Sequence, residues 1–176
     1  MSWESLKGGR TGVALQGLLA SAVMLGILVM LDPLTDLATI ASLGASSFIA
    51  FAMPRARASQ PRLLLGGYLV GIVVGWACYS LSTVLPSLAL LPIVRSSQVL
   101  FGAAAVGLST IIMVLTDTEH PPAAGLALGL VLSGWDLTTL AVIAVAVVSL
   151  VVLHKLLSPV VCELPCVTDK ELACQE

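Results

Sequence analysis

Charged side chains are scarce in this sequence, and their scarcity excludes most soluble functions. Only 10% of the 176 residues are Asp, Glu, Lys or Arg, whereas 58% are hydrophobic. A soluble domain of this size cannot bury so much apolar surface, so we expect an integral membrane protein that is surrounded by lipid. A formal net charge of −2, with the basic residues dispersed along the chain, does not favour a nucleic-acid partner.

Groups that could hold a metal ion or catalyse a reaction are also few. The two histidines, His120 and His154, are far apart in the sequence and do not form a zinc-binding pair. Three of the four cysteines, Cys162, Cys166 and Cys174, follow the last apolar run with a spacing that fits no standard zinc site, so we interpret them as free thiols. We therefore expect no metal, no cofactor and no enzymatic activity.

Ionisable residues are absent from the middle of every long apolar run. Pumps and coupled carriers usually need a buried carboxylate or histidine that carries a proton through the bilayer. The absence of such a residue predicts a passive pathway or a weakly coupled carrier.

Prolines and charged residues divide the apolar sequence into six segments, which we expect to be helices of an all-α membrane protein. They are residues 11–31, 37–53, 63–84, 97–115, 121–133 and 137–157. The chain then has one transmembrane domain, residues 1–160, and a polar cytoplasmic tail, residues 161–176. At about 1.5 Å per residue the fifth segment reaches only about 20 Å, short of a hydrocarbon core of about 30 Å.

The basic residues indicate how the segments cross the membrane. If all six cross, only Arg95 lies on the side opposite the other basic residues, so the positive-inside rule places both termini in the cytoplasm. We expect the inner membrane of a bacterial cell. Three crossings in each half then form two inverted three-segment repeats, whose second and fifth segments are short or broken. The alternative is four spans with two re-entrant hairpins.

The starts of the two short segments are the expected binding places for a solute. A helix N-terminus has a partial positive charge and free backbone amides, which suit a small anion. One start lies near Asp36, the expected N-cap of the second segment, and the other lies at His120, Pro121 and Pro122. We expect His120 at the cytoplasmic mouth of the pathway, where its charge would change near neutral pH.

Small, polar and basic residues complete the predicted pathway. Its candidate lining residues are Gly44, Ala45, Ser46, Ser47, Ser109 and Thr110. The hydroxyl groups among them would serve equally well to bond the preceding helical turn. Arg55, Arg57 and Arg62 would gather anions at the mouth, or they only set the topology. Asp117 and Glu119 would repel anions, and they would cap a helix or pair with these arginines.

Glycines recur at every fourth position in two segments. They are Gly67, Gly71 and Gly75 in the third segment and Gly125 and Gly129 in the fifth. Because apolar side chains gain little by leaving lipid for protein, helices in a bilayer associate where glycine lets their backbones approach. The pattern predicts close packing within the chain or, alternatively, a seam between copies in a homo-oligomer.

Three stretches of the sequence resemble the HPP family of integral membrane proteins. Residues 116–125 contain the His-Pro-Pro for which the family is named, and residues 41–47 and 59–67 agree with two further motifs. The family often has Thr or Ala where Leu126 follows the first of these stretches. The resemblance implies functional roles for His120, Pro121, Pro122, Gly44, Ser46, Gln60, Pro61 and Arg62.

The resemblance also implies a function. Family members are commonly described as four-helix membrane proteins, and plastid and cyanobacterial members are associated with nitrite transport. We therefore expect a transport protein or channel for a small inorganic monovalent anion, with nitrite as the first candidate. The alternative is a non-transporting membrane subunit that packs with a partner through its glycine faces and its cysteine-bearing tail.

Overall fold

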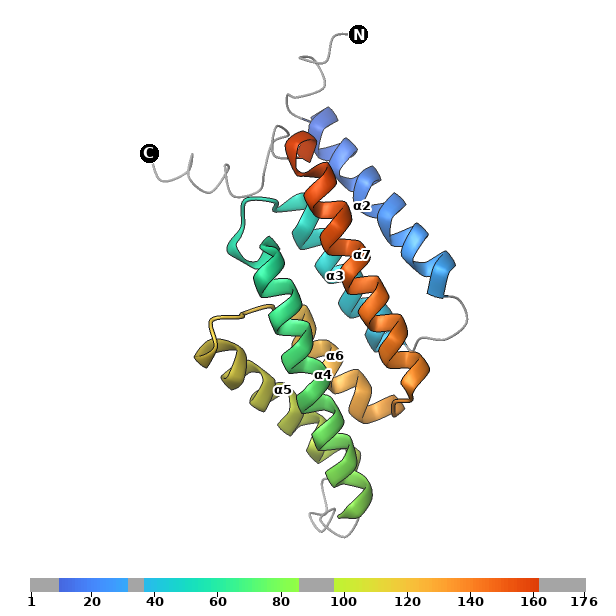
Figure 1. The fold of residues 1–176 in the computed structure, drawn as a ribbon, viewed down its shortest axis with the longest axis vertical. Helices are drawn as coiled ribbons and strands as arrows, with labels where there is room; N and C mark the ends of the chain where they lie inside the picture. Colours follow the sequence, from blue (N-terminus) through green and yellow to red (C-terminus); the bar gives the residue numbers. More distant parts are fainter. Residues whose placement is uncertain (1–9, 32–36, 86–96, 162–176) are drawn as a thin grey trace.

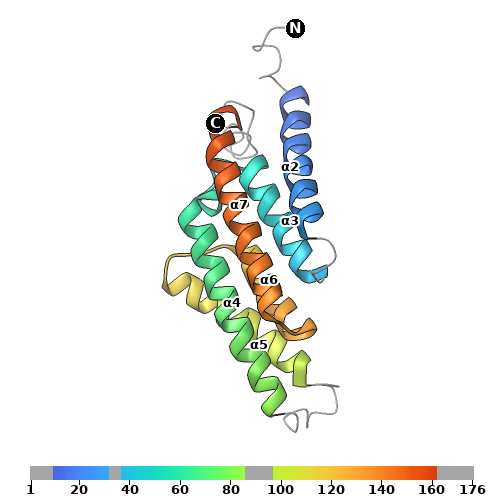
Figure 2. The same ribbon diagram turned by 45° about the vertical axis from the view of Figure 1, so that its right-hand side comes forward.

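Six α-helices and one short 3₁₀ helix form the described part of the computed structural model, which covers residues 10–31, 37–85 and 97–161 (Figure 1). In chain order they are α2 (Arg10–Leu31), α3 (Leu37–Ala52), η1 (Arg57–Ser59), α4 (Pro61–Val84), α5 (Ser97–Leu115), α6 (Pro121–Ser133) and α7 (Leu137–Val161). Successive α-helices run in alternating directions, and the start of α2 lies at the same end as the end of α7 (Figures 1 and 2). The six predicted helical segments are confirmed.

The lengths and surfaces of these helices suit a multi-pass membrane protein. Three helical stretches are long and apolar enough to span a bilayer: Pro61–Val84, Ser97–Leu115 and Leu137–Ser158. Three further apolar stretches of the described chain are shorter: Gly17–Gly26, Leu37–Ala52 and Pro121–Ser133. Large apolar side chains such as Leu69 and Ile111 lie exposed on the outside, where lipid would cover them. The inverted-repeat arrangement stays a prediction.

The short helix α6 lies at the centre of the bundle. Helices α3, α4 and α5 all pack against it, and eight of its thirteen residues are buried. Its side chains Leu126 and Leu130 join a core cluster with Leu43 and Phe51 of α3. A helix too short to span the bilayer is tolerated when it is buried in protein, and α3, α4 and α5 bury the middle of α6 between Pro122 and Val131.

Glycines of α4 allow α6 to approach it closely. A Cβ atom added to Gly67 would lie 2.5 Å from the Cβ of His120, and one added to Gly71 would lie 2.5 Å from the carbonyl oxygen of Ala123. Both distances are too short for any side chain, so the two backbones are in direct contact. A Cβ on Gly75 would lie 3.0 Å from the Ala127 carbonyl oxygen. This seam is therefore used within the chain.

The two glycines of α6 differ in whether they lie at a helix–helix contact. Gly129 is buried in the bundle. Gly125 was predicted to pack against another helix, but it is exposed, and a Cβ there would meet no described atom within 4 Å. The reason is that Gly125 lies on the side of α6 that faces away from α4.

The end of α5 determines how the chain enters α6. Asp117 adopts a left-handed conformation with φ of 57°. The amide of Thr118 donates to the Met113 carbonyl at 2.9 Å, and the amide of Asp117 donates to the Val114 carbonyl at 3.4 Å. These two bonds form a Schellman-type helix end, which usually has glycine at this position and tolerates aspartate. The turn directs the linker back toward α6.

One helix end differs from its prediction, and some predicted residues lie outside the described part of the chain. The last helix continues through Pro159 to Val161, beyond the predicted end at residue 157. The expected N-cap of α3 and the tail cysteines fall outside the described residues, as do three basic residues used for topology: Asp36, Cys162, Cys166, Cys174, Lys7, Arg95 and Lys170.

Candidate functional site

His120 is the centre of the predicted site, and the fold buries it completely. It lies in the linker between α5 and α6 as the N-cap residue of α6, and its exposed fraction is 0%. The centroid of its ring lies 5.5 Å from that of Tyr68 on α4. We predicted a position at an open mouth. The structure instead encloses His120 among α3, α4 and the α3–α4 connection.

Both ring nitrogens of His120 have hydrogen-bond partners. Nδ1 lies 3.2 Å from the carbonyl oxygen of Ala58, and Nε2 lies 2.7 Å from Oγ of Ser46. Because a carbonyl oxygen can only accept, Nδ1 carries a hydrogen in this arrangement. His120 is therefore held between the α3–α4 connection on one side and α3 on the other.

The contacts continue from Ser46 through two further side chains. Oγ of Ser46 lies 2.8 Å from the hydroxyl oxygen of Tyr68, which lies 3.1 Å from Oγ of Ser42. Ser42 in turn donates to the carbonyl oxygen of Pro122 at 2.7 Å. We call the four side chains, from His120 through Ser46 and Tyr68 to Ser42, the His120 chain. It is a continuous line of polar groups inside an apolar bundle.

Local sequence features bring these groups together. Ser42 and Ser46 are four residues apart, so they lie on the same face of α3. Tyr68 follows Gly67, the glycine that lets His120 approach α4. The buried Ser59 donates to the carbonyl of Pro54 at 2.8 Å, which fixes the α3–α4 connection that presents the Ala58 carbonyl.

Burial changes the acid–base behaviour of His120. It lowers the pKa of His120 from its ordinary value to about 4, and the hydrogen bond to the Ala58 carbonyl opposes this shift. The predicted titration near neutral pH therefore does not hold for this conformation, in which the side chain is neutral at pH 7. The cause is desolvation by burial, which outweighs the hydrogen bond to Ala58.

The prediction that the start of α6 offers bare amides to an anion is wrong. Pro121 and Pro122 occupy the first two helical positions and have no N–H. The third amide, that of Ala123, donates to the carbonyl oxygen of His120 at 2.9 Å. The first three positions of α6 thus offer no free donor, and any solute site here must depend on side chains.

The remaining candidates on α3 do not line the same site. Ser47 donates to the carbonyl oxygen of Ala20 at 3.2 Å and so joins α3 to α2. Ala45 is exposed on the outer surface. Gly44 is half-buried, and the nearest atom to an added Cβ would be Cε of Met24 at 3.9 Å. Of the small residues predicted on α3, only Ser46 contacts His120.

The two candidates on α5 bond their own helix. Ser109 is buried and donates to the carbonyl of Ala105, while Thr110 donates to the carbonyl of Val106 at 2.8 Å. Their hydroxyl groups are therefore engaged in the preceding turn, which was one of the two predicted alternatives. Thr110 also borders the cavity described below.

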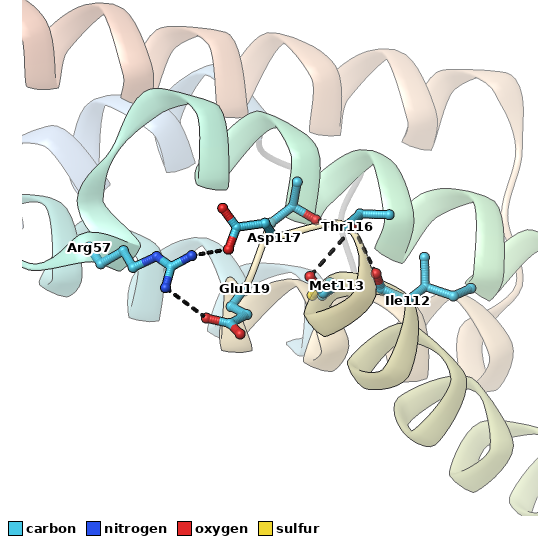
Figure 3. Close-up of polar contacts among 7 residues, drawn as sticks. Arg57, Ile112, Met113, Thr116, Asp117 and Glu119 are labelled. Carbon is cyan, nitrogen blue, oxygen red and sulfur yellow. Dashed lines mark hydrogen bonds and ion pairs between the residues drawn. The ribbon is translucent and has the colours of Figure 1, made fainter.

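The three arginines predicted to form a basic mouth are exposed, and Arg57 contacts acidic residues of the α5–α6 linker. Arg57 forms an ion pair with Asp117, and its Nη1 lies 3.9 Å from Oε2 of Glu119 (Figure 3). Arg55 and Arg62 are also exposed.

A cavity of about 270 Å³ lies next to His120. Its lining residues come from α5, the linker and the start of α6: Thr110, Met113, Val114, Glu119, His120, Pro121 and Ala124. Since a water molecule occupies about 30 Å³ of liquid, this space has room for a small anion with some of its water. It is the cavity through which a solute could reach the buried ring.

Sequence reasoning did not identify Tyr68, Ser42 or the Ala58 carbonyl as members of the site. The four-residue spacing of Ser42 and Ser46 was a usable signal, because it places two hydroxyl groups on one helix face. Nothing in the sequence indicates that Tyr68 reaches them. In the described part of the chain, no group of three or more metal-ligating side chains comes together.

Comparison with known proteins gives one match. The family model described as HPP, transmembrane region, matches residues 6–163. No curated protein and no solved structure matches the chain. The matched region includes the three stretches 41–47, 59–67 and 116–125, and the fold brings them together: Ser46 bonds His120, and Gly67 contacts it.

Proposed function

This chain belongs to the HPP transmembrane family, and from that premise we propose that it carries a small monovalent inorganic anion across the membrane. Nitrite is the first candidate, because the resemblance to plastid and cyanobacterial members points to it. On this proposal the protein is a transporter or channel and catalyses no reaction.

The observation that supports transport is the His120 chain itself. Polar side chains inside a membrane protein cost free energy and usually mark a substrate or ion pathway. Here four of them form a connected line between α3, α4 and the linker, whereas other buried polar side chains such as Ser82 and Ser109 bond only their own helix. The adjoining cavity of about 270 Å³ gives a solute a place beside that line.

The charged surface near Arg57 suits an anion entrance. Its exposed arginines attract anions, and the contact of Arg57 with Glu119 places this surface at the rim of the cavity. We propose that this surface faces the cytoplasm, with both termini on the same side of a bacterial inner membrane. Contact between the two short helices α3 and α6 supports a pair of inverted three-helix repeats.

Nitrite flux into proteoliposomes tests the proposal. Because nitrous acid can cross lipid unaided, each measurement is compared with protein-free liposomes at the same pH. We expect nitrite entry well above that background for the wild type, and a loss of roughly tenfold or more for His120→Ala.

Ser82→Ala is the matched control, since Ser82 is also buried but donates only to the Tyr79 carbonyl of its own helix at 2.7 Å. Its flux is expected to equal that of the wild type. If the wild type passes neither nitrite nor a related anion faster than bare lipid, the transport proposal fails. If His120→Ala transports normally, His120 has no part in it.

A further inference from the structure

The His120 chain has more polar contacts than its four side chains, when neutral, have hydrogens for hydrogen bonding. It starts at the Ala58 carbonyl, ends at the Pro122 carbonyl and includes five close polar contacts. Ser42, Ser46 and Tyr68 each have one O–H, and a neutral imidazole has one N–H. The four side chains therefore supply four hydrogens for five contacts.

The direction of each bond follows from the two carbonyl ends. Ser42 donates to Pro122, so its oxygen must accept from Tyr68. Tyr68 must then accept from Ser46, and Ser46 must accept from Nε2 of His120. Nδ1 already donates to Ala58. All five contacts are hydrogen bonds only when both nitrogens of His120 carry a hydrogen, which makes the ring a cation.

We propose that the His120 chain is a proton-binding site, and that it takes up one proton together with each anion that enters the cavity beside it. This inference rests on the proposed anion transport and adds its coupling. The proton and the anion move as an electrically neutral pair. This coupled transport replaces the passive pathway that we expected because the apolar runs contain no ionisable residues in their middle.

The surroundings of His120 explain why the anion is needed. Burial alone keeps the ring neutral, and the neighbouring helices α3, α5 and α6 contain no ionisable side chain. α4 contributes Tyr68 to the site and has the exposed Arg62 in its first turn. From η1, Arg57 pairs with Asp117 and Glu119 of the linker, and Glu119 also lines the cavity, with its side chain 44% exposed. Because Arg57 and solvent offset the charge of Glu119, an anion in the cavity is the additional negative charge that offsets the cost of a buried imidazolium.

The proton uptake needs only rotations of hydroxyl groups. In the neutral state Nδ1 donates to Ala58, Ser46 donates to Nε2, Tyr68 donates to Ser46 and Ser42 donates to Pro122, so the contact between Tyr68 and Ser42 has no hydrogen. A proton from a hydronium ion adds to Nε2, forming an N–H bond and leaving a water molecule. The hydroxyl hydrogens of Ser46 and Tyr68 then turn toward Tyr68 and Ser42, respectively, while Ser42 keeps its bond to Pro122. No O–H bond of the protein breaks, and the anion balances the added charge.

Removing one hydroxyl group from the chain should remove the need for a fifth hydrogen. In Tyr68→Phe, Ser42 donates to Pro122, Ser46 donates to Nε2 and Nδ1 donates to Ala58, so a neutral ring satisfies every remaining contact. In Ser42→Ala the remaining three contacts are likewise filled by three hydrogens. A purely structural role for the chain predicts no such change in proton uptake.

Calorimetry of nitrite binding to the purified full chain in detergent tests this inference. Titrations near pH 6 in two buffers with different ionisation enthalpies give the number of protons taken up per nitrite bound. For the wild type and the Ser82→Ala control we expect close to one proton. We also expect the Kd for nitrite to fall about tenfold per unit decrease in pH, as obligatory co-binding requires. In Tyr68→Phe and Ser42→Ala the Kd should change less than about threefold per pH unit.

The possible results separate the two proposals. Nitrite binding without proton uptake by the wild type overturns the coupling and leaves anion transport standing. If Tyr68→Phe and Ser42→Ala both take up as many protons per nitrite as the wild type, the proton does not bind to the His120 chain. Absence of both nitrite binding and nitrite flux in the wild type removes the proposed function on which the inference rests.

Discussion

The molecule buries two histidines, and their surroundings differ. His120 is 0% exposed, and both of its ring nitrogens are hydrogen-bonded to other elements. His154 on α7 is 7% exposed, its Nδ1 has no partner among the described residues, and its ring meets the edge of Phe51 at a centroid distance of 6.3 Å. Burial of a histidine is therefore not enough to mark a site. A connected set of polar partners is what distinguishes His120.

The packing around the two histidines explains this difference. Near His120, α4 and α6 touch through glycine, so polar side chains of α3, α4 and the α5–α6 linker come within bonding distance. Near His154, α2 and α7 leave an apolar groove of about 640 Å³ whose lining includes Leu19, Val23 and Leu153. A groove of this kind is filled by lipid chains or side chains, and it brings no polar groups together.

The largest effect should come from breaking the glycine contact on the His120 side. In Gly71→Ala the new Cβ would lie 2.5 Å from the Ala123 carbonyl oxygen, a backbone atom that cannot move independently. We expect a loss of about 3 kcal/mol of folding stability, measured by thermal unfolding in detergent. The control is Gly107→Ala on α5, where an added Cβ meets nothing within 4 Å. Equal stability of the two variants would contradict the close α4–α6 contact.

Ser46 and Ser47 of α3 allow the connected polar chain to be compared with a single hydrogen bond on the same helix. Ser46→Ala leaves the Tyr68 hydroxyl and Nε2 of His120 without their shared partner, and we expect a loss of about 2 kcal/mol. Ser47→Ala removes a single bond of 3.2 Å to Ala20 on the other side, with an expected loss of about 1 kcal/mol. Chemical denaturation of both variants gives the two values, and a reversed order would argue against a connected chain.

The pH dependence of stability should depend on His120. Because the pKa of His120 is lowered to about 4 in the fold from about 6.5 when unfolded, the unfolded chain binds more protons between these values. In anion-free buffer the contribution of His120 to stability should thus be greatest above about pH 6.5 and fall toward pH 4, by at most about 1.4 kcal/mol per pH unit. His120→Gln should flatten this profile, and an unchanged profile would show that other groups cause it.

The smallest effect is expected at the charged surface. The side chains of Arg57, Asp117 and Glu119 are all more than a third exposed, so solvent screens their attraction. Arg57→Ala should change the stability by less than about 1 kcal/mol. Its effect should appear instead as slower nitrite entry at low ionic strength, and this difference should vanish in high salt. A large stability loss would mean that the ion pairs hold the linker in place.

Much of the fold could be predicted because the sequence separates its helices clearly. Residues 97–115 and 121–133 are helical with the predicted bounds, since charged residues and prolines stand at their ends. The α6 amides were mispredicted for a reason visible in the sequence itself, because Pro121 and Pro122 have no N–H to offer. The burial of His120 and its contact with Tyr68 depend on how α4 and α6 pack, which no local pattern reveals.

The glycine seam has a mechanical consequence. Since the backbones of α4 and α6 touch without an intervening layer of side chains, we expect these two helices to move together. The cavity beside His120 is bounded on its other side by Thr110, Met113 and Val114 of α5. We therefore expect α5 to be the helix that moves when the cavity widens.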